Sequence, residues 1–328
     1  MNNLWQNIKR PVMALAPMAD VTDAAYRAII AKYGKPDVMW TEFVSADGLA
    51  LAPESGRRKL LKDLEYSEVE RPIIAQFFTA SSENMKKAAE LASKLGFDGV
   101  DINMGCPDKS VEKQGAGAEL LKNVTLAREL IKAAKDGAGG LPISIKTRTG
   151  YNKPELETWL PEILKEEPSV VTIHARTRKE LSKVPAQWDL IKRAVEIRNA
   201  SGEKTLIFGN GDIKDLKEAR ARIKETCCDG VMLGRAIFGN PFLFSEKKCP
   251  EGIEGLKLRL EVLVEHAKLF EKLLGSPPAS GKNFAVMKKH FKAYISEFPG
   301  AGDLRLRLLD TNNADEVKRI LSEFIKTI

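Results

Sequence analysis

The sequence predicts a (β/α)8 barrel, the TIM-barrel architecture, followed by a small domain that contains only helices. Over about the first 240 residues, short apolar segments alternate eight times with segments of helical length. Barrels of this kind take about 250 residues. After residue 243 the alternation stops and only helical periodicity continues. We therefore expect two domains, residues 1–243 and residues 244–328.

The expected strands are runs of four or five mostly apolar residues, typical of strands buried on both faces. They cover residues 12–16, 37–40, 73–77, 99–103, 142–146, 170–174, 205–208 and 230–233. An open, doubly wound sheet is the alternative arrangement. It favours a glycine-rich turn after the first strand, where this chain has Ala16, Pro17 and Met18.

Segments of helical length and composition separate these strands. They cover residues 23–33, 82–95, 118–135, 155–165, 190–199 and 213–224, and the second crossover, residues 49–64, is less regular. In the terminal domain, apolar residues recur at helical spacing over residues 260–274, 284–295 and 317–324. Ser276, Pro277 and Pro278 separate the first two of these helices.

The composition is that of a globular protein, and we expect it in the cytoplasm. It is 43% hydrophobic and 30% charged, has no run of eighteen apolar residues, and its first ten residues lack the apolar core of a signal peptide. The four cysteines have no paired spacing suited to zinc, and there are only three histidines. We therefore expect no metal site, no membrane contact and a monomer.

The net charge of the chain is positive. The 52 lysine and arginine residues outnumber the 45 aspartate and glutamate residues, for a net charge of +7 and an isoelectric point of about 9.0. Between residues 272 and 296 there are five lysines and no carboxylate. This stretch is either a solvated helix face or a surface for an anionic partner.

Polar side chains end five consecutive strands of the expected barrel. Active sites of such barrels lie at the carboxyl ends of the strands. The third expected strand ends in Gln76 and the fourth leads through Asn103 to Cys106. The fifth ends in Lys146, the sixth in His174, and the seventh leads to Asn210. Each residue alone could cap the loop that follows it, but together they predict one polar site.

Cys106 stands out among these residues. It lies between Gly105 and Pro107, which end the fourth strand. A buried structural cysteine is the commoner situation for a lone cysteine. The position of Cys106 at the mouth of a strand, close to Asn103, favours a chemical role instead.

Glycines after the last two strands predict a phosphate site. Gly209, Asn210, Gly211 and Asp212 follow the seventh strand, and Gly234 and Arg235 follow the eighth. Backbone N–H groups and helix starts in this pair of loops often bind phosphate in barrels. Two ordinary tight turns are the alternative.

A thiol, a lysine, a histidine and amides around a phosphate-bearing ligand suit a flavin mononucleotide (FMN) enzyme. The ammonium group of Lys146 can stabilise negative charge at the N1 and O2 edge of the reduced ring, and amides can bind ring carbonyls. The thiol of Cys106, with a free pKa of about 8.5, is protonated at neutral pH and can donate a proton to carbon.

Eight motifs occur here in the order that they have in a known family. They are Ala16, Pro17, Met18 with Val21, Thr22, Asp23 and Arg27; Thr41, Glu42; Gln76; residues 101–107 with Gly115, Gly117 and Ala118; Lys146, Arg148, Gly150; His174, Arg176, Thr177; Asn210, Gly211, Asp212; and Gly234, Arg235 with Gly239, Asn240 and Pro241. With these motifs the chain resembles the tRNA-dihydrouridine synthase family, flavoenzymes that reduce selected uridines in tRNA. The resemblance covers nearly the whole chain.

The resemblance implies roles for these residues. Pro17, Met18, Ala19, Gln76, Lys146 and His174 contact the flavin ring, and Asn210, Gly211, Asp212, Gly234 and Arg235 hold its phosphate end. Asn103 and Arg148 bind a uracil flipped out of the tRNA. In the implied reaction NADPH, or NADH, reduces FMN, hydride passes from flavin N5 to uracil C6, and Cys106 protonates C5. The terminal helices bind tRNA with Lys282, Lys288, Lys289 and Lys292.

The chain departs from the family's pattern at two places. Ser110 separates Lys109 from Val111, which are commonly adjacent, and Gln187 stands where an aspartate usually precedes the tryptophan. These differences bear on which uridine is modified. The alternatives are a barrel flavoenzyme acting on a free small molecule of the dihydroorotate or dihydropyrimidine type, an RNA-binding relative without catalysis, and an isomerase or aldolase in which Lys146 forms a Schiff base.

Overall fold

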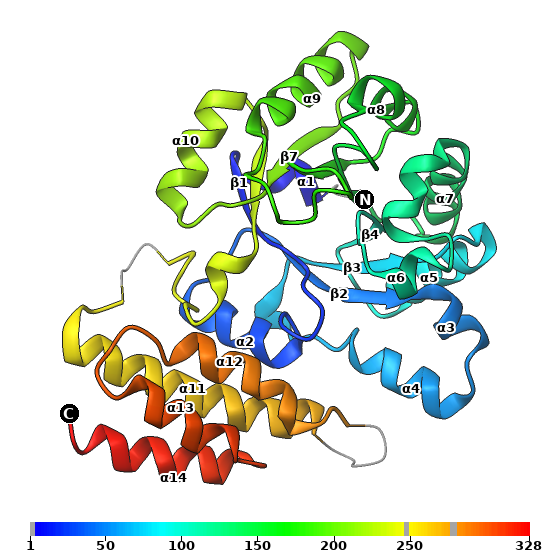
Figure 1. The fold of residues 1–328 in the computed structure, drawn as a ribbon. Coiled ribbons are helices and arrows are strands. Elements are labelled where there is room, and N and C mark those ends of the chain that lie inside the picture. The colour runs from blue at the N-terminus through cyan, green and yellow to red at the C-terminus, as the bar shows by residue number, and fades with distance from the viewer. Residues whose placement is uncertain (1–3, 246–248, 276–280) are drawn as a thin grey trace. The chain divides into compact units, whose positions relative to one another are not determined.

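The computed structural model describes residues 4–245, 249–275 and 281–328 (Figure 1). These residues form two compact units. The first takes the described residues of Met1–Pro17, Asp37–Leu64 and Arg71–Gly234, and the second those of Met18–Pro36, Glu65–Glu70 and Arg235–Ile328. The second unit thus includes two early segments of the chain besides the terminal helices. A domain boundary at residue 243 stays a prediction, and Ser276, Pro277 and Pro278 lie outside the described residues.

Eight parallel strands form the sheet of the first unit. They are β1 (Val12–Leu15), β2 (Met39–Ser45), β3 (Ile73–Phe78), β4 (Gly99–Met104), β5 (Ile143–Arg148), β6 (Val170–His174), β7 (Leu206–Asn210) and β8 (Gly230–Leu233). Their order is β1-β8-β7-β6-β5-β4-β3-β2, and a parallel bridge from Ala14 to Val38 joins the two outer members. The predicted (β/α)8 barrel is confirmed, with all eight of its strands.

Helices surround the sheet (Figure 1). They are α3 (Ala46–Leu51), α4 (Glu54–Lys62), α5 (Ser82–Lys94), α6 (Lys109–Glu112), α7 (Val124–Gly137), α8 (Leu156–Leu164), α9 (Trp188–Ser201) and α10 (Leu216–Thr226). The short helix α1 (Leu4–Asn7) instead packs its Trp5 against the apolar interior of the barrel. The single helix predicted over residues 118–135 is wrong. Asn123 interrupts it, because its side chain accepts the Leu126 N–H at 3.1 Å and caps α7, while η2 (Gly117–Lys122) before it is a 3₁₀ helix.

Strand register makes the barrel interior apolar at one end and polar at the other. Its apolar part consists of Trp5, Val12, Ala14, Ala16, Val38, Trp40, Ile74, Val170, Leu206, Phe208 and Met232. Side chains alternate along a strand, so residues two positions beyond Ile74, Val170 and Phe208 point the same way. These residues are Gln76, Thr172 and Asn210. The polar end is therefore the carboxyl end of the strands.

The second unit is helical. It combines α2 (Ala24–Tyr33) with α11 (Gly252–Leu274), α12 (Met287–Tyr294), α13 (Ala301–Leu309) and α14 (Ala314–Ile325). The predicted terminal helices are confirmed, and α13, whose Leu304 and Leu308 are buried, is a further helix that was not predicted. None of the helices in the described ranges is long and apolar enough to cross a membrane. Within those ranges, no group of three or more His, Cys, Asp or Glu could hold a metal ion.

Two histidines are buried inside this helical unit. The His266 ring stacks on the Tyr26 ring with 4.8 Å between centroids, and it meets the His290 ring edge-on at 4.5 Å. Burial lowers the pKa of His290 to about 3 and that of His266 well below its ordinary value. Both rings are therefore neutral in the folded protein.

We expect the helical unit to lose stability as the pH falls below about 6.5. In the unfolded chain both histidines bind protons near pH 6.5, so the unfolded state binds more protons than the folded state. The free energy of unfolding then falls by up to about 1.4 kcal/mol per pH unit for each histidine. Urea unfolding across this range measures the slope, and His290→Gln should reduce it. An equal slope in the variant would contradict the role of His290.

Candidate active site

Cys106 lies in a tightly held turn directly after β4. Its N–H donates to Asn103 Oδ1 at 2.9 Å, and the Gly105 N–H donates to the same oxygen at 3.1 Å. The Cys106 carbonyl accepts the Ala118 N–H at 2.9 Å. Gly117 permits this contact, because its φ is +63° and a Cβ there would lie 2.7 Å from the Cys106 oxygen. Backbone contacts on both sides therefore set the position of the thiol.

The side chain of Cys106 is half-buried against a small apolar cluster. The cluster contains Phe43, Phe78, Val111 and Ala116. Burial here raises the pKa of the Cys106 thiol above its ordinary value. At neutral pH the thiol keeps its proton, as a general acid must.

Lys146 brings a cation to the carboxyl end of β5. The strand register places Lys146 opposite Asn103 on one side and Thr172 on the other. Its Nζ donates to Asn210 Oδ1 at 3.3 Å. Burial and the nearby charge of Arg148 lower the pKa of Lys146 to about 8. The amine is thus charged at pH 7 and loses its proton as the pH rises through about 8.

Arg148, two residues further along β5, connects the Cys106 turn to the loop after β6. Its Nε donates to the Gly105 carbonyl at 2.8 Å. Its Nη1 donates to the carbonyls of Thr177 at 3.2 Å and Leu181 at 3.3 Å. Burial lowers the pKa of Arg148 to about 10, so the guanidinium remains charged at neutral pH.

His174 ends β6 beside Arg176. Arg176 Nη1 lies 3.1 Å from His174 Nε2, and a guanidinium can only donate, so Nε2 accepts and the ring proton is on Nδ1. Arg176 also forms an ion pair with the carboxylate of Asp212, which accepts the Ala186 N–H at 2.9 Å. Arg176 therefore links His174 to the loop after β7.

The loop after β7 approaches His174 closely. Gly211 has a φ of +133°, and a Cβ there would lie 2.9 Å from Ala186 Cβ and 3.3 Å from His174 Cδ2. The carbonyl of Gly211 accepts the indole N–H of Trp188 at 3.0 Å. A side chain at position 211 would thus displace His174 or the loop that follows it.

The structure brings nine predicted site residues to this end of the first unit. They are Gln76, Asn103, Cys106, Lys146, Arg148, His174, Asn210, Gly211 and Asp212. Pro17 and Gly234 follow β1 and β8 in the same unit, whereas Met18, Ala19 and Arg235 belong to the second unit.

The predicted RNA-binding lysines also belong to the second unit. Lys288, Lys289 and Lys292 lie on α12, and Lys282 precedes it. Lys289 Nζ is 2.9 Å from the carboxylate of Asp20, and both side chains are exposed.

Arg178, Glu112 and Tyr151 were not predicted as part of the site. Arg178 Nε donates to Glu112 Oε1 at 2.6 Å, and its guanidinium lies 5.3 Å from the centre of the Tyr151 ring. These contacts join α6, just after Cys106, to the loops after β5 and β6. Arg178 and Glu112 are 66 residues apart, and no motif connects them.

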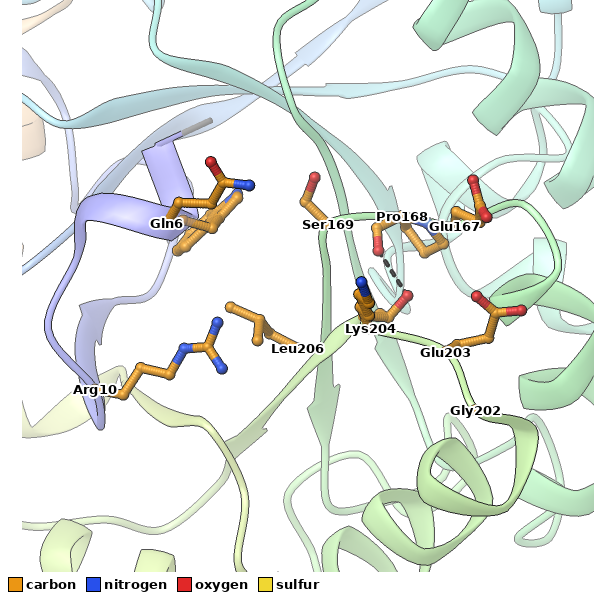
Figure 2. A pocket seen from close by; sticks show the side chains of 11 residues that line it. Gln6, Arg10, Glu167, Pro168, Ser169, Gly202, Glu203, Lys204 and Leu206 are labelled. Carbon is orange, nitrogen blue, oxygen red and sulfur yellow. Dashed lines mark hydrogen bonds between the residues drawn. The ribbon is translucent and has the colours of Figure 1, made fainter. Parts of the chain in front are cut away.

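A cavity of about 600 Å³ lies at the other end of the barrel. Figure 2 shows Gln6 and Arg10 on one side of it and Ser169 and Lys204, just before β6 and β7, on the other. Active sites of such barrels form at the carboxyl ends of the strands. This cavity is therefore separate from the candidate active site.

Comparison with known proteins identifies the family. A family model described as dihydrouridine synthase (Dus) matches residues 14–328. The chain belongs to the dihydrouridine synthase family. As a dihydrouridine synthase it is an oxidoreductase, as its resemblance to that family implied.

Relatives of the chain match it over almost its full length. A probable tRNA-dihydrouridine synthase 2 of Bacillus subtilis (strain 168) is 37% identical over 327 residues, which cover 98% of this chain and 96% of that protein. A probable tRNA-dihydrouridine synthase of Staphylococcus aureus (strain COL) is 38% identical over 323 residues, 98% of this chain and 95% of that protein. The solved structure of morphinone reductase in complex with tetrahydroNAD has a TM-score of 0.49 and 13% identity, and covers 71% of this chain and 85% of that one.

Proposed function

We propose that this member of the family reduces specific uridines in tRNA to 5,6-dihydrouridine, with FMN as cofactor and NADPH or NADH as reductant. The observation that carries the proposal is the position of the Cys106 thiol, half-buried in the turn after β4, whose Asn103 pairs with Lys146 of β5. The names of the curated relatives, tRNA-dihydrouridine synthases, support tRNA as the substrate.

The polar groups at this end of the barrel fit a flavin. Within the described residues, Lys146 Nζ has one hydrogen bond, at 3.3 Å, and the buried Thr172 hydroxyl opposite it has none. Such groups leave donors for the polar edge of a ligand. When bound, a reduced flavin supplies a hydride to C6 of uracil.

Other residues of the site complete the cofactor site that we propose. Lys146 and His174 hold the polar edge of the ring. The remaining ring contacts are Pro17, Met18, Ala19 and Gln76, and the phosphate end is held by Asn210, Gly211, Asp212, Gly234 and Arg235. Because Arg176 neutralises the carboxylate of Asp212, the loop after β7 can accept a second negative group.

Cys106 supplies the proton that completes the reduction. Hydride at C6 and a proton from the Cys106 thiol at C5 together add the two hydrogen atoms of dihydrouridine. Arg148 Nε and Nη1 are bound to backbone carbonyls, which leaves Nη2 for a uracil carbonyl. Asn103 Nδ2 donates one hydrogen to Gln76 and has a second one for the base.

The helical unit provides a basic surface for the tRNA backbone. We propose that Lys282, Lys288, Lys289 and Lys292 bind phosphates, which makes RNA binding strongly dependent on salt. The exposed pair of Lys289 with Asp20 is worth at most about 1 kcal/mol, so a phosphate can replace Asp20. A cytoplasmic location and a monomeric state stay predictions.

Position-resolved detection of dihydrouridine tests the proposed function. Purified protein is incubated with NADPH and unmodified tRNA transcript, with NADH and with free uridine in parallel reactions. We expect dihydrouridine at defined positions of the transcript and none from free uridine. Reduction of free uridine at a similar rate, or a purified protein without flavin absorbance, would contradict the proposal. The first of these results favours a barrel flavoenzyme for small molecules.

A further inference from the structure

Asp101 is a buried carboxyl group that the proposed reaction does not use. It lies on β4 inside the barrel, two residues before Asn103, and its exposed fraction is 0%. Gln76 Nε2 donates to its Oδ2 at 2.6 Å, and the Ser144 hydroxyl donates to its Oδ1. Burial of a carboxyl group costs free energy of desolvation unless hydrogen bonds within the protein replace those to water.

Two side-chain amides connect Asp101 to the turn at Cys106. Asn103 Nδ2 donates to Gln76 Oε1 at 3.3 Å, and Gln76 Nε2 in turn donates to Asp101. At the other end, the N–H groups of Gly105 and Cys106 donate to Asn103 Oδ1 at 3.1 and 2.9 Å. Every bond of this amide chain runs in the same direction, from the turn toward Asp101.

The two ends of the amide chain determine that direction. An ionised carboxylate can only accept and a backbone N–H can only donate. Gln76 must therefore turn its NH₂ group to Asp101, and Asn103 must turn its oxygen to Cys106. Reversing either amide places two donors or two acceptors against each other. A hydrogen bond to a charged acceptor is also roughly twice as strong as a neutral one.

We propose that Asp101 is a positioning residue whose negative charge orients the amides of Gln76 and Asn103 and thereby holds the turn that carries Cys106. Its burial keeps it from touching a substrate. The inference deepens the proposed function and rests on it for the part that Cys106 plays in the reaction.

The charge on Asp101 can be changed by pH within an accessible range. Burial raises the pKa of Asp101 to about 6, against the opposing effects of Ser144, Gln76, Trp40 and the Lys146 charge. Below about pH 6 the carboxyl group gains a proton and its bond from Gln76 becomes a weaker, neutral one. The charged side chains that act on the Cys106 end of the amide chain are Lys146, Arg148 and Asp108.

The rate of Cys106 alkylation tests, without any substrate, whether Asp101 fixes the turn that carries Cys106. The full-length protein as purified is treated with iodoacetamide, and peptide mass spectrometry gives the rate at Cys106 relative to that at the exposed Cys227. We expect Asp101→Asn to raise this ratio about fivefold, because the loss of the charge loosens the turn. Ser144→Ala is the matched control. It removes another bond to the same carboxyl group but leaves the amide chain intact, so the ratio should stay within about twofold of wild type.

A double variant tests the direction of the bonds. In Asp101→Asn/Gln76→Glu the new amide donates to the new carboxylate, so every bond has a donor and an acceptor and a negative charge again faces Asn103. We expect the alkylation ratio to return to within about twofold of wild type. An unchanged ratio in Asp101→Asn, or a double variant as reactive as the single one, overturns the proposal.

A titration of the wild-type protein covers the case in which Asp101→Asn does not fold. Labelling with ¹⁵N-cysteine gives one amide resonance for each of the four cysteines. We expect the Cys106 resonance to shift with a midpoint near pH 6, as Asp101 titrates, while the Cys227 resonance does not. A Cys106 resonance that does not move around this pH overturns the proposal. Where Asp101→Asn folds, a titration that persists in this variant comes from another group and has the same consequence.

Measurement of kcat for uridine reduction separates the positioning role of Asp101 from the proposed function. Asp101→Asn should lower kcat for uridine reduction about tenfold and leave KM for RNA within about twofold, because Asp101 acts on the turn and not on the substrate. If wild type reduces uridine and Asp101→Asn has the same kcat, the positioning role is wrong. If wild type reduces no uridine but the alkylation and titration results hold, the proposed function fails and the positioning role stands.

Discussion

Cys106→Ala should lower the rate of uridine reduction by about 10²–10⁴-fold, the usual contribution of a positioned general acid. The flavin absorbance of the purified protein and its oxidation of NADPH should remain, because the variant removes the proton donor and no group proposed to hold the cofactor. The measurement is single-turnover reduction of a tRNA transcript, with flavin content determined in parallel. Cys227→Ala, which removes an exposed thiol at the end of α10, is the control and should behave as wild type.

The pH dependence gives an independent check on Cys106. The thiol is active when protonated and burial raises its pKa, so its deprotonation should lower the rate only above the ordinary range of a cysteine, separately from the loss of the Lys146 charge near pH 8. Cys106→Ala should lack this alkaline decline. Comparable turnover in the variant and the wild type would show that another group protonates C5.

Arg27→Met should destabilise the helical unit by about 3–5 kcal/mol, the cost of leaving one partner of a buried ion pair without its counter-ion. Arg27 Nε lies 2.7 Å from Glu70 Oε2, and the two side chains are 0% and 1% exposed. Arg27 also donates to the carbonyls of Thr22 at 2.7 Å and Glu65 at 2.6 Å. It therefore joins the two early segments of the second unit, and its removal leaves the buried carboxyl group of Glu70 without its ion-pair partner.

Urea unfolding and hydrogen exchange in peptides from α2 and α11 measure this loss. Lys87→Ala is the control, because Lys87 and Glu83 form an exposed pair at 2.6 Å on α5 that is worth about 0.3–0.5 kcal/mol. Arg27→Met/Glu70→Met removes both charges and should recover part of the stability. If Arg27→Met costs no more than Lys87→Ala, the buried pair does not stabilise the unit.

The barrel could be predicted because its signals are local. Each strand is a short apolar run, and each polar residue at a strand end can be located by counting along that run. The part of β2 after Trp40 was not predicted, because Thr41 and Glu42 interrupt the local apolar pattern. Both residues are nevertheless buried. The Thr41 hydroxyl accepts the Gln76 N–H at 3.1 Å, so a contact with the next strand keeps this polar segment extended.

In the candidate site too, residues with a local sequence signal could be predicted and long-range contacts could not. Cys106, Lys146 and His174 could be found from the sequence, because strand order and alternation of side chains bring the ends of neighbouring strands together. The distant ion pairs could not be found in this way. Arg178 meets Glu112 across 66 residues in the first unit, and Arg27 meets Glu70 across 43 in the second. Such pairs have no periodicity or motif, and it is the register of the strands and the packing of the helices that bring them into contact. Folding therefore decides which groups are buried together, and burial sets the charge states of Asp101, Cys106 and Lys146.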